Sequence, residues 1–230
     1  VLLFDLDAQH KGLVQVTSEG RTFSRVFSED SRTVEIALGD GASGTASAFL
    51  SYVREGIVHI AIGFDHVLFL VSLLLPAVLV RRDGRWHPAD GARAAAIDVG
   101  KVVTAFTAAH SLTLTAATLG AVSLPSRWVE SAIAASVVIV ALDNLRPMLP
   151  LARWHAAFLF GLVHGLGFAS VLGDLGLPPG ALALSLLGFN LGVELGQLAI
   201  VATFLPLAWT MRAGRVYRQG VFAAGSVGVA

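Results

Sequence analysis

An apolar stretch of the chain, from Glu55 to Val80, is long enough to cross a lipid bilayer as a helix. The same stretch contains His59, Asp65 and His66. Ionisable side chains are costly in hydrocarbon, at about 2.5–3.5 kcal/mol each on insertion scales, and usually occur there because a function requires them. We therefore expect a membrane-spanning helix whose two histidines and carboxylate take part in the function of the protein.

The spacing of these residues predicts how they are arranged. His59 and His66 are seven positions apart, so in a continuous α-helix their side chains lie on nearly the same face. Asp65 then points away from that face, toward a neighbouring helix or the backbone. The histidine pair predicts a polar site on one side of the span, to which other helices must contribute.

The composition of the chain is that of an integral membrane protein. Of its 230 residues, 55% are hydrophobic and 14% are charged, whereas soluble domains usually contain about 25% charged residues. The formal net charge of zero argues against nucleic acid as a partner. Cysteine is absent, which excludes disulfides, thiolate metal ligands and cysteine nucleophiles. The lipid bilayer is therefore the expected environment of this chain.

Residues 1–47 differ from the rest. They contain short runs typical of β-strands, separated by glycine, serine and charged residues. We interpret them as the C-terminal strands of an extracytoplasmic β-sandwich, ending in a linker from Gly39 to Ser47. The predicted domains are then residues 1–47 and a transmembrane helical domain, residues 48–230. Because the chain begins without methionine and ends within an apolar run, we interpret it as a segment of a longer protein.

Five apolar segments follow, each close to the roughly 20 residues that a helix needs to span a bilayer. The predicted fold class is mainly α, a polytopic helical membrane bundle of five to six or more spans. A sixth span begins near Gly220. The five segments are residues 53–80, 97–121, 127–149, 153–174 and 180–211.

Basic residues alternate between the loops, and this alternation predicts the orientation of the bundle. The second loop contains only Arg127, and the fourth contains no basic residue. Because basic loops tend to be cytoplasmic, we expect a bacterial inner-membrane protein whose N-terminal segment is periplasmic. The basic loops are the first, with Arg81, Arg82, Arg85 and Arg93, the third, with Arg146 and Arg153, and the fifth, with Arg212, Arg215 and Arg218.

Four spans each place an imidazole or a carboxylate at a similar depth, at about 1.5 Å per residue. Such a set suits a borderline divalent ion: nickel, cobalt, zinc or copper. Hydrogen-bonding neighbours would orient the ligands, and we expect Asp65, Thr107, Ser111, Asn190 and Gln197 to do so. The candidate metal ligands are His59, Asp65, His66, His110, His164 and Glu194.

Two features of the later spans connect this site to helix packing. Asn190, Glu194 and Gln197 recur at i, i+4 and i+7, so they share one face of the fifth span. Two GxxxG patterns, Gly161–Gly165 and Gly192–Gly196, predict close approach of the fourth and fifth spans. That approach would bring His164 and Glu194 together.

Five segments together resemble the HupE/UreJ family, in its branch with an N-terminal extracytoplasmic domain. They are HIAIGFDHVLFLVSLLL, FTAAHSLTL, ESAIAASVVIVALDN, FGLVHGLGFA and FNLGVELGQ, and the likeness covers about residues 53–211. The resemblance implies that His59, Asp65 and His66 form a metal-handling motif in a nickel or cobalt permease, of a kind associated with hydrogenase and urease maturation. His164 and Glu194 would occupy two later motif blocks. The chain departs from the family pattern because Glu194 lies in the span after His164.

Three functions fit the residues. In the first, the protein transports a divalent metal, with ligands from His66, His110, His164 and Glu194, while His59 and Asp65 line the entry or orient the ligands. In the second, it is a membrane-embedded zinc hydrolase with a three-histidine site and Glu194 as general base. In the third, it is a non-catalytic subunit or sensor that binds through its β segment. Each of these three functions is compatible with a homo-oligomer.

Overall fold

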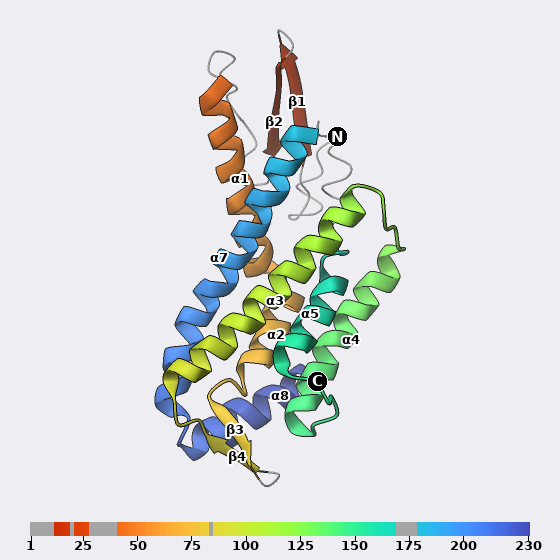
Figure 1. The fold of residues 1–230 in the computed structure, drawn as a ribbon. Helices are drawn as coiled ribbons and strands as arrows, with labels where there is room; N and C mark the ends of the chain where they lie inside the picture. The colour runs from red at the N-terminus through yellow and green to blue at the C-terminus, as the bar shows by residue number, and fades with distance from the viewer. Residues whose placement is uncertain (1–11, 19–20, 28–40, 83–84, 169–178) are drawn as a thin grey trace.

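The computed structural model describes residues 12–18, 21–27, 41–82, 85–168 and 179–230, and most of these are helical. Two antiparallel hairpins accompany the helices (Figure 1). The strands are β1 (Gly12–Ser18), β2 (Arg21–Phe27), β3 (Leu79–Arg82) and β4 (Arg85–Pro88). The helices are α1 (Gly41–Ile62), α2 (Phe64–Leu74), α3 (Ala92–Thr118), α4 (Ser126–Leu145), α5 (Arg153–His164), α7 (Pro179–Met211), the π-helix η1 (Val216–Ala224) and α8 (Gly225–Val229).

The N-terminal region contains one hairpin, in which β1 pairs with β2 from Gly12 opposite Phe27 to Ser18 opposite Arg21. Two of the predicted strands form this hairpin, while those at residues 1–7 and 32–38 lie outside the described residues. A β-sandwich is not seen in the described part of the chain. The predicted linker was wrong from Gly41 onward, because α1 begins there. Extending an existing helix costs less than starting one, so a permissive segment beside a strong helix can become helical.

The stretch predicted as one straight span is two helices. α1 ends at Ile62, α2 begins at Phe64, and their axes differ by 71°. Gly63 separates them in an extended conformation, with φ −73° and ψ 92°. The prediction of a continuous helix was therefore wrong at Gly63, a residue type with low helix propensity. The chain enters β3 after α2, so the basic first loop is a β-hairpin.

The described helices include membrane-type segments. By length and composition, α4 and residues 180–211 of α7 could each cross a membrane, and the bent pair α1–α2 would make a third span. α3 is 27 residues long but carries several charged residues near its start, and α5 has 12 residues. Residues 169–174 of the predicted fourth span lie outside the described residues. The structure thus confirms a mainly helical protein with two to three candidate spans, and the higher count stays a prediction.

Glycines set which helices approach each other most closely. α1 packs along α7, where Gly56 and Gly192 meet so closely that an added Cβ would overlap the backbone of the partner helix. α3 packs along α5, where a Cβ on Gly161 would lie 2.8 Å from the carbonyl oxygen of Phe106. The two GxxxG patterns therefore pack on different partners, and the prediction that they join the fourth and fifth spans was wrong.

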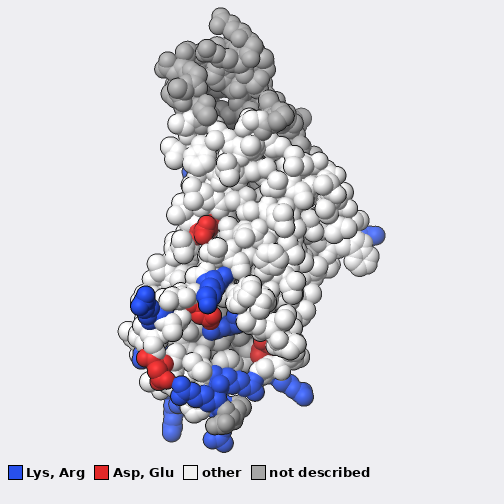
Figure 2. All heavy atoms as spheres, in the orientation of Figure 1, with Lys and Arg blue, Asp and Glu red and all other residues white. Residues whose placement is uncertain are grey.

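The bundle has two distinct ends. The β3–β4 hairpin, the α4–α5 connection and the α7–η1 connection lie at one end, and the β1–β2 hairpin lies at the other (Figure 1). Figure 2 shows Lys and Arg side chains gathered at the first of these ends on the visible face, while the side of the bundle is mostly uncharged. This arrangement agrees with the alternation of basic loops along the sequence.

Candidate metal centre

Four helices bring four imidazoles together. His59 lies in the last turn of α1, His66 in the first turn of α2, His110 in the C-terminal half of α3, and His164 is the last residue of α5. The ring centroid of His66 lies 4.6 Å from that of His59, 4.9 Å from that of His164 and 6.2 Å from that of His110. His66, His110 and His164 are buried, and His59 is partly buried.

The bend at Gly63 changes the geometry that the sequence predicted. His59 and His66 are close, as expected, but they belong to two helices whose axes diverge by 71°, so their proximity does not come from one helix face. Asp65 does not point away from the pair as predicted. Its Oδ1 atom lies 3.1 Å from Nδ1 of His66, because both residues begin the new helix.

Potential metal ligands form two groups among the described residues. The first group consists of His59, His66 and His110, and the second consists of Asp65, His66 and His164. In each group one ligand atom per residue lies within 4.8 Å of the others. His66 belongs to both groups and therefore lies at the centre of the arrangement.

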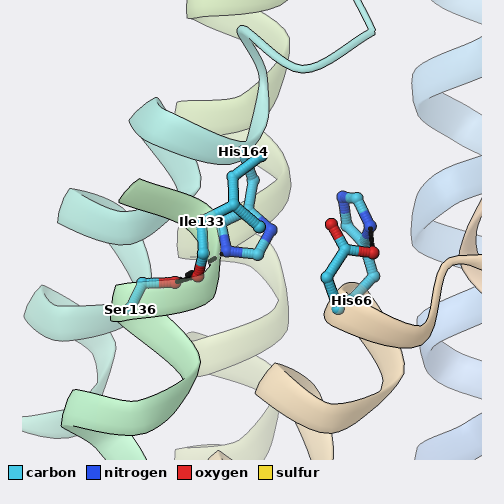
Figure 3. A network of polar contacts seen from close by, with 5 residues as sticks. His66, Ile133, Ser136 and His164 are labelled. Atoms are coloured by element: carbon cyan, nitrogen blue, oxygen red, sulfur yellow. Dashed lines mark hydrogen bonds and ion pairs between the residues drawn. The ribbon is translucent and has the colours of Figure 1, made fainter. Parts of the chain in front are cut away.

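The hydrogen bonds around His164 determine which ring nitrogen carries the proton. The Ser136 hydroxyl donates to the carbonyl oxygen of Ile133 at 2.6 Å, so it accepts the bond from Nε2–H of His164 at 2.9 Å (Figure 3). The lone pair of His164 is then on Nδ1. That atom is buried and has no hydrogen-bond partner among the described residues.

His110 is oriented in a similar way. The side-chain amide of Asn190 donates to the carbonyl oxygen of Leu186 at 2.9 Å, and its Oδ1 atom accepts from Nδ1–H of His110 at 3.4 Å. The His66 Nδ1–H donates to the carboxylate of Asp65. In both histidines the lone pair is then on Nε2, which is buried and has no hydrogen-bond partner in the described part of the chain.

Three buried imidazoles thus each have one nitrogen held by an acceptor and the other nitrogen available as a donor atom to a cation. Their surroundings are apolar, since the ring of Phe69 lies 4.9 Å from His164 and the ring of Phe106 lies 6.0 Å from His110. An unsatisfied buried polar atom is unfavourable, and three close together require an explanation. One metal ion in either group would satisfy two of them, and an outer hydrogen bond to the second nitrogen is typical of metal-ligating histidines.

The other predicted residues differ in their relation to this centre. Asn190 contacts His110, and Gln197 accepts a 3.1 Å bond from Thr107, so the prediction that Asn190 and Gln197 share one face of α7 is confirmed. Ser111 donates to the backbone of Thr107 at 2.6 Å and does not orient an imidazole in the described structure. Glu194, which is half-buried on the same helix, belongs to neither group of ligands.

Ser136 is the residue that sequence reasoning missed. It lies in α4, a span to which no metal-site residue was assigned, and it is fully buried beside His164. The only signal is a serine within the apolar run SAIAASVVIVAL. A serine of this kind indicates a polar partner on another helix, but the partner is fixed only by tertiary packing.

The fold and this centre define a helical membrane-type protein with a buried set of histidines that could hold a metal ion. The chain belongs to the HupE/UreJ family: a family model described as HupE / UreJ protein matches residues 37–230, which confirms the predicted resemblance. This family is associated with nickel and cobalt transport. Comparisons with curated proteins and with solved structures gave no match.

Proposed function

We propose that this protein transports a divalent transition metal ion across the membrane and binds it at the histidine groups between α1, α2, α3 and α5. The observation that supports this most strongly is the hydrogen-bonded orientation of His66, His110 and His164, each with a buried nitrogen lone pair available. Membership of a family associated with nickel and cobalt transport supports it independently.

The donor atoms favour a borderline metal. Imidazole nitrogen with one carboxylate suits Ni²⁺, Co²⁺, Zn²⁺ or Cu²⁺, whereas Ca²⁺ and Mg²⁺ prefer oxygen ligands. The chain has no cysteine, and its two methionines are Met148 and Met211. Met148 is exposed in the α4–α5 connection and Met211 is the last residue of α7, so both lie at the basic end of the bundle and away from the histidines, which disfavours a Cu⁺ site. The family association makes nickel or cobalt the first choice.

The shared residue suggests how the ion moves. When Nδ1 of His66 donates to Asp65, only Nε2 is left to bind a metal, so His66 serves one group at a time. We propose that the ion passes from the group with His59 and His110 to the group with Asp65 and His164, while His66 remains a ligand. A site with three protein ligands leaves coordination positions open, which favours exchange.

The hydrolase alternative is not supported by the geometry. That mechanism assigns the general base to Glu194, which lies outside both groups of ligands in the described structure. A base must be within hydrogen-bond reach of the water that it activates. The transport function therefore explains more of the arrangement with fewer assumptions.

The first experiment is titration of the purified protein with Ni²⁺, Co²⁺ and Zn²⁺ by isothermal calorimetry. His66→Ala should abolish high-affinity binding, because His66 belongs to both groups. His87→Ala is the matched control, since His87 is exposed on β4 and distant in sequence from both groups. Unchanged affinity in His66→Ala would refute the proposed site.

Transport itself is tested in proteoliposomes that contain a metal-sensitive dye. The wild type and His87→Ala should load the vesicles with metal, and His66→Ala should not. A protein that binds metal tightly but does not move it would contradict transport and favour the sensor alternative.

A further inference from the structure

A pocket lined by both polar and apolar side chains lies at the basic end of the bundle, apart from the histidines. It has a volume of about 370 Å³ and lies between β4, the end of α4 and η1. Pockets of this size accommodate small ligands. Its polar lining comes from Arg215, Arg218, Gln219 and Asn144, and its apolar lining includes Trp86 and Phe222.

The cavity carries two positive charges that have no acidic partner among the described residues. Neither Arg215 nor Arg218 forms an ion pair with a carboxylate among the described residues, and no acidic residue lines the cavity. The Nε atom of Arg218 is buried and has no hydrogen-bond partner in the described structure. A buried guanidinium nitrogen without a partner is costly, so an anionic ligand would relieve it.

The remaining walls of the cavity are held in place. Asn144 donates to the carbonyl oxygen of Ser72 at 2.8 Å, which fixes the end of α4. The rings of Trp86 and Phe222 pack edge to face, with centroids 5.1 Å apart. Arginine matches phosphate oxygens with two parallel hydrogen bonds, and an aromatic wall suits the apolar part of an ester.

The position of the cavity agrees with this chemistry. Lys and Arg side chains gather at the same end of the molecule (Figure 2), and Arg212 stacks 3.6 Å above the ring of Trp209 there. Tryptophan and arginine are typical of the membrane–water interface, the depth at which lipid phosphates lie. We propose that this pocket binds a phosphate ester through Arg215 and Arg218, either a phospholipid headgroup or a soluble phosphate ester.

The test is native mass spectrometry of the protein in neutral detergent, titrated with phosphatidylglycerol, phosphatidylcholine or glycerol 3-phosphate. The wild type should retain one phosphatidylglycerol in preference to phosphatidylcholine. The double variant Arg215→Gln/Arg218→Gln should bind it at least about tenfold more weakly, because both guanidinium forks are lost. Arg81→Gln, an exposed arginine at the same end that does not line the cavity, should bind like the wild type.

The titrations with lipid and with glycerol 3-phosphate distinguish a lipid ligand from a soluble one. Binding of phosphatidylglycerol that millimolar glycerol 3-phosphate does not displace supports a lipid ligand, and arginine-dependent binding of glycerol 3-phosphate supports a soluble one. Equal affinity of wild type and double variant for every compound would overturn the proposal. If the double variant elutes as an aggregate, Arg218→Lys is tested in its place. Lysine keeps the positive charge but cannot form two parallel hydrogen bonds to a phosphate. Unchanged binding by Arg218→Lys would then overturn the proposal.

Discussion

The imidazole rings of His59 and His66 lie 4.6 Å apart, although a 71° bend separates the helices that carry them. Gly63 forms this bend. A Cβ atom at position 63 would lie 2.7 Å from the carbonyl oxygen of His59 and 2.9 Å from Nδ1 of His66. Real Cβ contacts are not this short, so the bend and the close approach of the two rings both require glycine at position 63.

The first prediction concerns this glycine. Gly63→Ala should displace His66 and lower the affinity for Ni²⁺ about tenfold, because crowding of a packed site costs about 1–3 kcal/mol and tenfold corresponds to 1.4 kcal/mol. Calorimetric titration measures the effect. Gly100→Ala is the control, since a Cβ on Gly100 of α3 would meet nothing within 4 Å. Wild-type affinity in Gly63→Ala would show that the bend does not build the site.

The sequence predicted which histidines lie close together better than how they are arranged. Residue type and depth were enough to select His66, His110 and His164, because ionisable groups in apolar spans are rare. Helical periodicity also placed Asn190 and Gln197 on one face of α7, and both bond to α3 or its histidine. These inferences use only local spacing, which a regular helix preserves.

The features that could not be predicted depend on tertiary packing. A glycine inside a helix costs only about 1 kcal/mol relative to alanine, so Gly63 alone does not predict a break. GxxxG indicates close packing without naming the partner, and Gly192 packs on α1 rather than on α5. Ser136 acquires its role only because α4 lies beside the end of α5.

The second prediction concerns the orientation of His164. Ser136→Ala removes the acceptor for Nε2–H, so the ring of His164 loses its fixed tautomer. In the His59→Ala background, which leaves only the group with His164, calorimetric titration should show an affinity for Ni²⁺ that is about 10–100-fold lower. Ser131→Ala is the control in the same helix, because Ser131 is exposed and, among the described residues, bonds to the backbone of Arg127 alone. Equal affinities of the two variants would refute the role of Ser136.

The third prediction concerns the two ligand groups. His59→Ala leaves the group of Asp65, His66 and His164 intact, and His164→Ala leaves the other group intact, so each variant should still bind one metal ion. The wild type should also bind one, since His66 serves one group at a time. Elemental analysis after gel filtration gives the stoichiometry. Two ions in the wild type would contradict a shared ligand.

The proposed movement of the ion has a separate consequence for transport. His59→Ala and His164→Ala should each bind metal but fail to load proteoliposomes, because each lacks one of the two groups. Normal loading by either variant would show that a single group is sufficient, and that the ion does not pass between them.

The fourth prediction compares two carboxylates that are both candidate ligands. Asp65 contacts His66, whereas Glu194 belongs to neither group among the described residues. Hydrogen bonds to charged groups contribute about 1.5–3 kcal/mol, so Asp65→Asn should weaken Ni²⁺ binding about tenfold or more. The affinity of the isosteric Glu194→Gln for Ni²⁺ should stay within about threefold of that of the wild type. Calorimetry on both variants decides between them. A larger loss in Glu194→Gln would place that carboxylate on the metal, as its depth in the fifth span first suggested.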